Sequence, residues 1–125
     1  MIEVILPQAY NMRVEQLNEG MWAMTYLVEC DSTKKVALID PVWDNLSDYL
    51  SIIEDRGLTL EYAMATHTHA DHITGCFKLA EMTGCEYLMW NDTPSLGVTI
   101  YVDEETSITL GEIEFHFHHS PGHTG

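Results

Sequence analysis

The middle of the chain contains Thr66-His67-Thr68-His69-Ala70-Asp71-His72, and the organisation of the whole sequence can be worked out from this stretch. It places three histidines and one aspartate within six consecutive residues. Imidazole nitrogens and carboxylate oxygens are the ligands that zinc, iron and related metals take from proteins. A hydrophobic core rarely contains so many polar side chains close together. The stretch therefore predicts a metal centre.

The spacing of these residues predicts how they would share a metal. Side chains at alternate positions of an extended segment lie on one face, so His67 and His69 can bind the same ion as the chain leaves a strand. Asp71 falls where a helix can begin, a position that favours an acidic residue. Once the helix has started, His72 points away from the first pair, so Asp71 and His72 could bind a second ion. One-metal and two-metal centres both stay open, as does a histidine-rich polar loop that binds no metal.

The residues around this stretch predict a meander followed by alternating strands and helices. Strand-forming runs separated by polar turns predict a β-meander over 11–39. Over 36–90 the pattern is β-α-β-α-β, which requires parallel strands with helices packed on the sheet. The expected strands are 36–39, 60–66 and 86–90, and the expected helices are 44–56, capped by Asp44 or Ser47, and 71–83. The apolar stripes of these helices are Leu46, Tyr49, Leu50 and Ile53 in the first, and Ile73, Phe77 and Ala80 in the second.

The last predicted strand, 112–119, leads into a second histidine loop, after two short strands at 98–102 and 107–110. Its apolar residues alternate with His116 and His118, which we expect on the solvated face. Pro121 and Gly122 then force a turn that carries His123 back over the strand end. Alone, His123 would be an ordinary loop histidine. Beside His67 and His69 it is predicted to complete a three-histidine set with a fourth position open for water.

Three segments of the sequence resemble the metallo-β-lactamase fold superfamily. They are Thr66–Gly75 with its histidine motif, Ala37-Leu38-Ile39-Asp40-Pro41-Val42, and Ser120-Pro121-Gly122-His123-Thr124. Their order and separation fit the family over roughly residues 10–125, and 37–75 is most similar to the glyoxalase II and persulfide dioxygenase branch. The resemblance implies an α/β fold, the N-terminal half of an αββα sandwich, with a mixed sheet and two helices.

The resemblance also implies roles for the candidate ligands. His67, His69 and His123 would hold a first Zn²⁺ or Fe²⁺ ion, and Asp71 and His72 would serve a second. Asp71 would be the catalytic residue that orients a water or binds the second metal. Glyoxalase II hydrolyses a glutathione thioester, whereas the persulfide dioxygenases oxidise glutathione persulfide with O₂. In those dioxygenases one iron is held by equivalents of His67 and His123 together with a later aspartate.

Relatives of this kind extend well beyond the Pro-Gly-His loop, so we expect residues 1–125 to be one incomplete domain. The isolated chain is then expected to be a weak or inactive enzyme. The alternative is a non-catalytic metal-binding half that assembles with a partner chain or with itself. A homodimer through an exposed half-core is one such assembly. A diiron electron-transfer module shares the fold but would need further carboxylates and a flavin domain.

The charge and the cysteine content of the chain limit the partners and the cellular compartment that we expect for it. The chain has 20 acidic and 5 basic residues and a formal net charge of −15, which argues against nucleic acid or an anionic membrane as partner. The family resemblance implies a small-molecule thiol or thioester as the substrate. Three cysteines without a C-x-x-C pair, and no export signal, favour reduced thiols and a cytoplasmic location. We expect Asp40 to fix a loop by hydrogen bonding and Cys76 to be a small buried residue.

Overall fold

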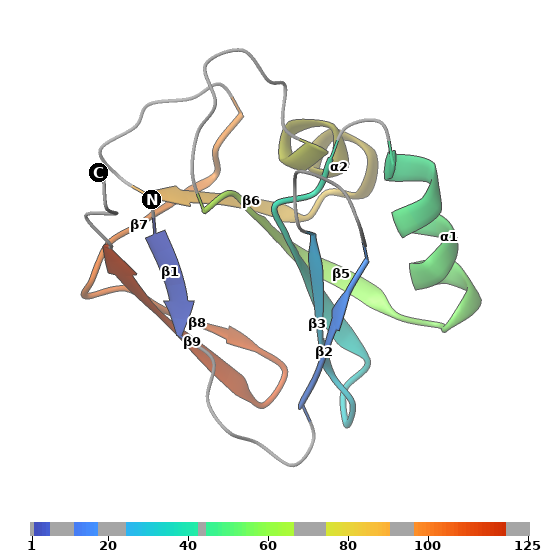
Figure 1. Ribbon diagram of the computed structural model, residues 1–125, viewed down its shortest axis with the longest axis horizontal. Helices are drawn as coiled ribbons and strands as arrows, with labels where there is room; N and C mark the ends of the chain where they lie inside the picture. The colour runs from blue at the N-terminus through green and yellow to red at the C-terminus, as the bar shows by residue number, and fades with distance from the viewer. Residues whose placement is uncertain are drawn as a thin grey trace.

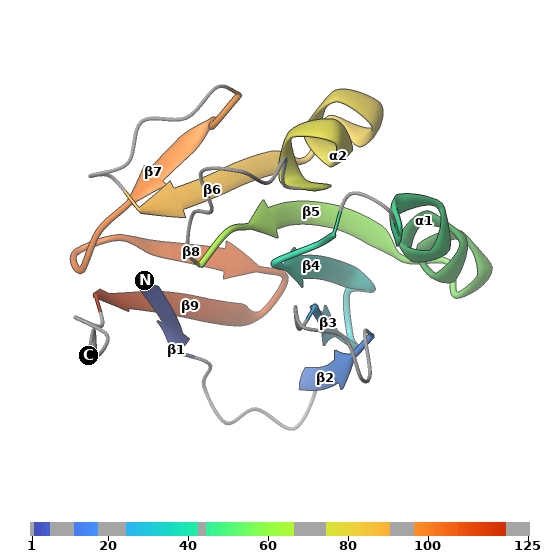
Figure 2. The ribbon, with the colours of Figure 1, turned by 45° about the horizontal axis from the view of Figure 1, so that its top comes forward.

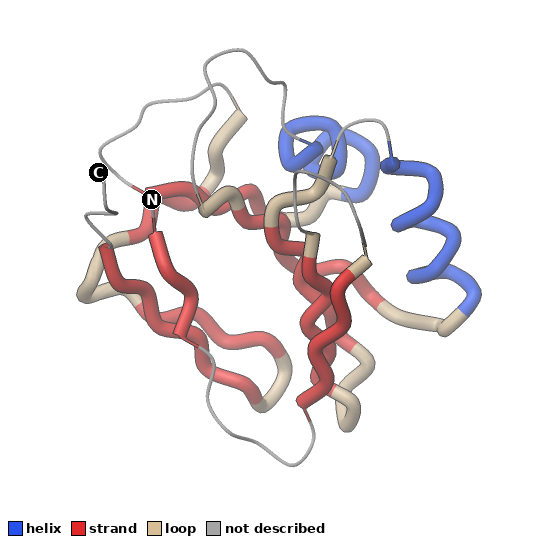
Figure 3. Tube along the Cα trace, in the orientation of Figure 1, coloured by secondary structure: helices blue, strands red, loops and turns tan. Residues whose placement is uncertain are grey.

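The computed structural model describes six segments of the chain, namely residues 2–5, 12–17, 25–42, 45–66, 75–90 and 97–119. These segments form three layers, in which two helices cover one face of a six-stranded sheet and a three-stranded sheet covers the other (Figures 1 and 2). The tube drawing separates the helical layer from the strands of both sheets (Figure 3). This arrangement is the predicted α/β architecture with a mixed sheet and two helices.

The six-stranded sheet is antiparallel at one end and parallel at the other. Its order is β2-β3-β4-β5-β6-β7. The first three strands pair antiparallel, which confirms the meander predicted over 11–39. From β4 onward all pairs are parallel, which confirms the β-α-β-α-β unit. The strands are β2 (Met12–Gln16), β3 (Tyr26–Cys30), β4 (Lys35–Ile39), β5 (Thr59–Met64), β6 (Glu86–Trp90) and β7 (Ile100–Val102).

The first helix, α1 (Leu46–Asp55), buries the predicted stripe. Leu46, Tyr49 and Ile53 are buried against the sheet, and Leu50 is partly buried. The predicted cap is wrong for Ser47, which lies inside the helix. The residue at the cap is Asn45, whose N–H donates to Val42 O at 3.1 Å, so a backbone turn rather than a side chain begins the helix. Asp44 lies outside the described residues.

The second helix, α2 (Gly75–Thr83), packs against the same core as α1. Phe77 and Ala80 are partly buried and pack against this core, as predicted, whereas Cys76 and Leu79 are fully buried. The Phe77 ring also packs on the backbone before β7. A Cβ placed on Gly97 would lie 2.5 Å from that ring. The predicted start of this helix at Asp71, and Ile73, fall outside the described residues.

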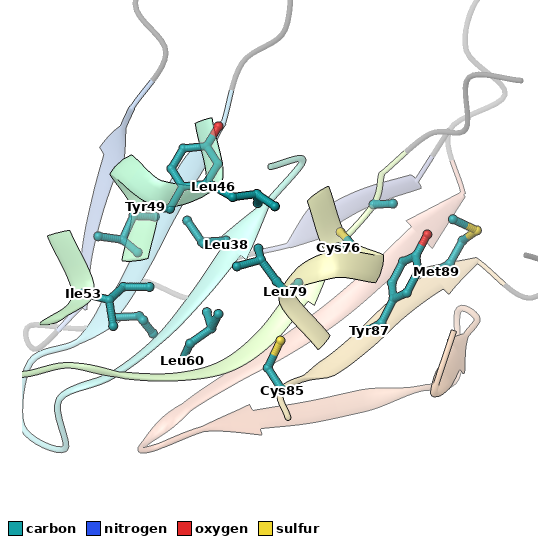
Figure 4. Close-up of a cluster of buried hydrophobic side chains, with 14 residues drawn as sticks. Leu38, Leu46, Tyr49, Ile53, Leu60, Cys76, Leu79, Cys85, Tyr87 and Met89 are labelled. Atoms are coloured by element: carbon teal, nitrogen blue, oxygen red, sulfur yellow. The ribbon is translucent and has the colours of Figure 1, made fainter. Parts of the chain in front are cut away.

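Two hydrophobic cores lie on opposite faces of the six-stranded sheet. Figure 4 shows the core between this sheet and the helices, where Leu38 and Leu60 from the strands meet Tyr49, Ile53 and Leu79 from the helices. The second core lies between the two sheets. The central strand β4 therefore buries residues on both of its faces.

The smaller sheet has the order β1-β9-β8, and its outer face is polar where it is described. It contains β1 (Ile2–Ile5), which the sequence pattern did not predict, β8 (Ser107–Leu110) and β9 (Ile113–His119). Ile113, Phe115 and Phe117 are buried against the larger sheet, while His116 and His118 are exposed, as predicted.

The described surface offers little apolar material for self-association. Val14, Met82 and Tyr101 are the large hydrophobic residues exposed on it. The half-core expected to drive a homodimer is therefore not found on the described part of the smaller sheet, and the homodimer stays a prediction. Within the same residues, no helix has the length and apolar content needed to cross a membrane.

Candidate metal centre

The predicted ligands lie in two segments outside the described residues. His67, His69, Asp71 and His72 fall in 67–74, and His123 falls in 120–125. Among the side chains that the structure does describe, no group of three or more histidines, cysteines or carboxylates could hold a metal. The roles of these residues as metal ligands therefore stay predictions. The structure describes the residues on either side of 67–74 and the strand that precedes 120–125.

Both ends of segment 67–74 are tied to two adjacent residues, Asp40 and Pro41. At the start, the Thr66 N–H donates to Asp40 Oδ1 at 2.8 Å, and the Thr66 hydroxyl donates to Asp40 Oδ2. At the end, the Gly75 N–H donates to Pro41 O at 3.0 Å. A Cβ at Gly75 would lie 2.9 Å from Leu46 Cδ2 and 3.0 Å from Pro41 O, so α2 begins in close contact with this turn. Thr66 and Gly75, the residues on either side of the histidine segment, therefore both lie at the turn formed by Asp40 and Pro41.

Hydrogen bonds of its own backbone hold Asp40 in place. It follows β4 with φ of 54°, a left-handed conformation that aspartate adopts more readily than most residues. Its N–H donates to Met64 O at 2.7 Å, and its carbonyl accepts from the Thr25 hydroxyl at 2.8 Å. These contacts confirm that Asp40 fixes a loop through hydrogen bonds, as predicted.

Two buried residues that the sequence analysis did not assign to the site complete this frame. The Tyr49 hydroxyl accepts from the Val42 N–H at 3.1 Å and lies 3.1 Å from the Thr25 hydroxyl. Thr25 is fully buried and Tyr49 nearly so. Tyr49 was predicted as a core residue of α1, and its phenol oxygen was the available signal, because a buried tyrosine usually needs a hydrogen-bond partner.

The strands that lead to the two histidine segments end on the same side of the molecule. Figures 1 and 2 both show β5, which precedes His67, and β9, which precedes His123, finishing at one edge together with β6. Ligand sites form at the carboxyl ends of parallel strands. This placement is what a shared centre for His67, His69 and His123 requires.

The three cysteines lie in the cores or between turns. Cys76 and Cys85 are buried, as predicted for Cys76. Cys30 is buried where the β3–β4 turn meets the β8–β9 turn. Burial raises the pKa of its thiol, but hydrogen bonds from the Glu112 N–H, Ser32 and Thr33 outweigh burial and lower that pKa to about 7.

With this frame in place, comparison with known proteins gives the family. The sequence model of the metallo-beta-lactamase superfamily matches residues 23–125. This chain belongs to the metallo-beta-lactamase superfamily. The match includes both histidine segments and the Asp40–Pro41 turn that precedes them in the chain.

Relatives within the family are identical to this chain at about a third of the aligned positions. Human mitochondrial persulfide dioxygenase ETHE1 is 34% identical over 101 residues, which are 80% of this chain and 39% of that protein. The hydroxyacylglutathione hydrolase of Rhodospirillum rubrum is 34% identical over 102 residues, 79% of this chain and 39% of the enzyme. The chain therefore spans about two fifths of the length of these relatives.

Solved structures agree on the fold. The crystal structure of ETHE1 from Myxococcus xanthus superposes with a TM-score of 0.76 at 29% identity, and the match covers 84% of this chain and 47% of that one. The BLEG-1 B3 metallo-beta-lactamase superposes with a TM-score of 0.71 at 20% identity, covering 89% of this chain and 63% of that one. The chain thus corresponds to part of the metallo-beta-lactamase fold, as predicted.

Proposed function

We propose that this chain carries the metal centre of an enzyme that acts on a glutathione-type thiol compound, with oxidation of a persulfide as the first candidate reaction. The observation that carries the proposal is that the residues on either side of segment 67–74, Thr66 and Gly75, are hydrogen-bonded to the adjacent residues Asp40 and Pro41. Thr66 lies just after the carboxyl end of the parallel strand β5, so the predicted ligand segment begins at that end of the strand. The 34% identity with human persulfide dioxygenase ETHE1 supports the choice of substrate class.

The donor set suits Fe²⁺ or Zn²⁺, as one ion or a pair. His67, His69 and His123 would supply three imidazoles to a first ion, and Asp71 with His72 would serve a second. Such an ion, when bound, supplies Lewis acidity, and iron in addition supplies redox chemistry with O₂. Two of the three histidines with a carboxylate would satisfy the two-histidine, one-carboxylate set of non-haem iron oxygenases.

The protein's own groups would position the reactants. Asp71 would orient the attacking group and hold its proton, as a carboxylate near the reacting atoms can do. Thr66 and Asp40 act as positioning residues, because their hydrogen bonds fix the direction in which the chain enters His67. A ligand segment fixed at both ends loses less conformational entropy when it binds an ion.

Thioester hydrolysis is an alternative reaction, supported by the 34% identity with the hydroxyacylglutathione hydrolase of Rhodospirillum rubrum. The second alternative is a non-catalytic metal-binding half that assembles with itself or with a partner chain.

The test begins with the metal content of the tag-free chain, followed by activity after loading with Fe²⁺ without oxygen or with Zn²⁺. We expect at most slow iron-dependent O₂ uptake with glutathione persulfide. The H67A/H69A double variant should lose the metal bound at the candidate centre and any activity, whereas the exposed-surface control Glu104→Gln should keep both. Zinc-dependent cleavage of a glutathione thioester would favour the hydrolase, and metal binding without turnover would favour the half-domain. A folded chain that takes up neither metal would refute all three.

A further inference from the structure

The outward face of β9 carries metal-ligating side chains that the candidate centre does not use. Glu114, His116 and His118 occupy alternate positions of the strand and are exposed. The residues between them, Phe115 and Phe117, are buried against the larger sheet. The strand is therefore anchored by its apolar face, while both imidazoles are open to solvent.

We propose that His116 and His118, supported by Glu114, form a second transition-metal site that takes Cu²⁺, Ni²⁺ or Zn²⁺. Alternate residues of a strand are separated by about 6–7 Å along the chain and share a face, so two exposed imidazoles at this spacing can reach one ion. Of these ions Cu²⁺ should bind most tightly, in keeping with the general order of affinities for nitrogen ligands. Water would fill the remaining positions.

Glu114 gives the pair the arrangement that metal-binding histidines usually have. Its Oε1 lies 2.7 Å from His116 Nε2. A histidine that donates one ring N–H to a carboxylate keeps the lone pair of its other nitrogen for a metal, and the carboxylate also makes the ring a stronger ligand. In this geometry Glu114 accepts from Nε2, so Nδ1 is the nitrogen of His116 that would bind the ion.

Neighbouring strands and the overall charge favour a cation on this face. On β1, Glu3 is the register partner of His118, so a further acidic residue occupies an adjacent position of the sheet. The formal net charge of −15 raises the local concentration of divalent cations. Since no three described ligands already converge, the two rings must rotate to bind, which predicts weaker binding than at a preformed site.

The site can be tested by Cu²⁺ titration of the tag-free chain, followed by electron paramagnetic resonance to count nitrogen ligands. The H67A/H69A/H123A variant removes the candidate centre, and we expect it to retain one Cu²⁺ with a two-nitrogen spectrum. His118→Ala should then weaken binding about tenfold or more, because the second imidazole no longer binds within the same chain. Glu114→Gln should weaken binding about tenfold through loss of the orienting carboxylate. The exposed control Glu105→Gln should leave the affinity unchanged.

A second measurement makes the outcome independent of how that triple variant folds. In the otherwise unchanged chain, the H116A/H118A variant should bind one Cu²⁺ fewer than the parent, and the fold should persist because both side chains are exposed. Unchanged copper stoichiometry and spectrum in H116A/H118A would overturn the proposal, whatever the activity at the candidate centre.

Discussion

The pairing of Asp40 with Thr66 allows a quantitative test of how the histidine segment is held. The Asp40 carboxylate accepts both the N–H and the hydroxyl of Thr66. A hydrogen bond to a charged acceptor contributes about 1.5–3 kcal/mol, and the partial exposure of both residues favours the lower end. Thr66→Val removes only the hydroxyl bond, so we expect a loss of about 1–2 kcal/mol in the free energy of unfolding.

Replacing the carboxylate should cost more than replacing the hydroxyl. Asp40→Ala loses both bonds and places alanine at φ of 54°, which adds about 1–2 kcal/mol. The expected total is about 3–5 kcal/mol. Asp40→Gly is the matched control, since glycine tolerates this φ and should cost about 1 kcal/mol less than alanine. Urea denaturation followed by circular dichroism measures each value.

The double variant decides whether the two residues act together. Because the hydroxyl bond is shared, D40A/T66V should be less destabilised than the sum of the single variants by about 1–2 kcal/mol. Additivity within about 0.3–0.5 kcal/mol would refute the assigned contact. If Thr66 also positions the metal ligands, Thr66→Val should weaken metal binding about tenfold. If a destabilised variant keeps its metal affinity, the Asp40–Thr66 pair stabilises the sheet but does not position the metal ligands.

Three further predictions concern contacts elsewhere. Gly75→Ala should lower stability by about 1–2 kcal/mol through crowding of Pro41 O, although alanine favours a helix, and a raised urea midpoint would contradict this. The Arg56 guanidinium donates to Glu15 Oε1 at 2.8 Å and lowers the pKa of that carboxyl. The small stabilisation from this exposed pair should therefore be complete above pH 4.5, the ordinary pKa of glutamate, and be lost as the pH falls through the lowered pKa. Arg56→Ala should abolish that pH dependence. When followed by ultraviolet absorbance, the Cys30 thiolate should titrate near pH 7 rather than 9.0, and this transition should be absent in Cys30→Ser. The contribution of the thiolate to the free energy of unfolding should be complete above pH 9 and decline as the pH falls towards 7.

Local patterns in the sequence were sufficient for most of the architecture. The strand β4 contains the continuous apolar run 36–39, and the stripe of α1 recurs at helical spacing, so these elements can be recognised without knowledge of their neighbours. The full burial of Leu79 in α2 could not be recognised in this way. Phe77 is as apolar as Leu79 but is only partly buried, and it packs beside Gly97 from another segment of the chain.

Elements that depend on long-range pairing were beyond the reach of local patterns. The four residues of β1 become a strand by pairing with β9, more than a hundred residues later in the chain. The hydrogen bonds of Thr25 and Tyr49 likewise connect three separate segments. The predicted ligands themselves came from residue type and spacing, because metal coordination needs particular side chains at particular intervals.

The contacts of Thr66 with Asp40 and of Gly75 with Pro41 separate the residues that hold the fold from those predicted to bind a metal. Thr66 and Gly75 fix where the chain leaves and re-enters the described fold, and both lie outside segment 67–74. Substitutions within the segment that keep its length should therefore leave these contacts in place, since the entropy of closing a flexible loop depends mainly on its length. Ligands for another metal can then be introduced into the segment without a change to the sheet or the helices.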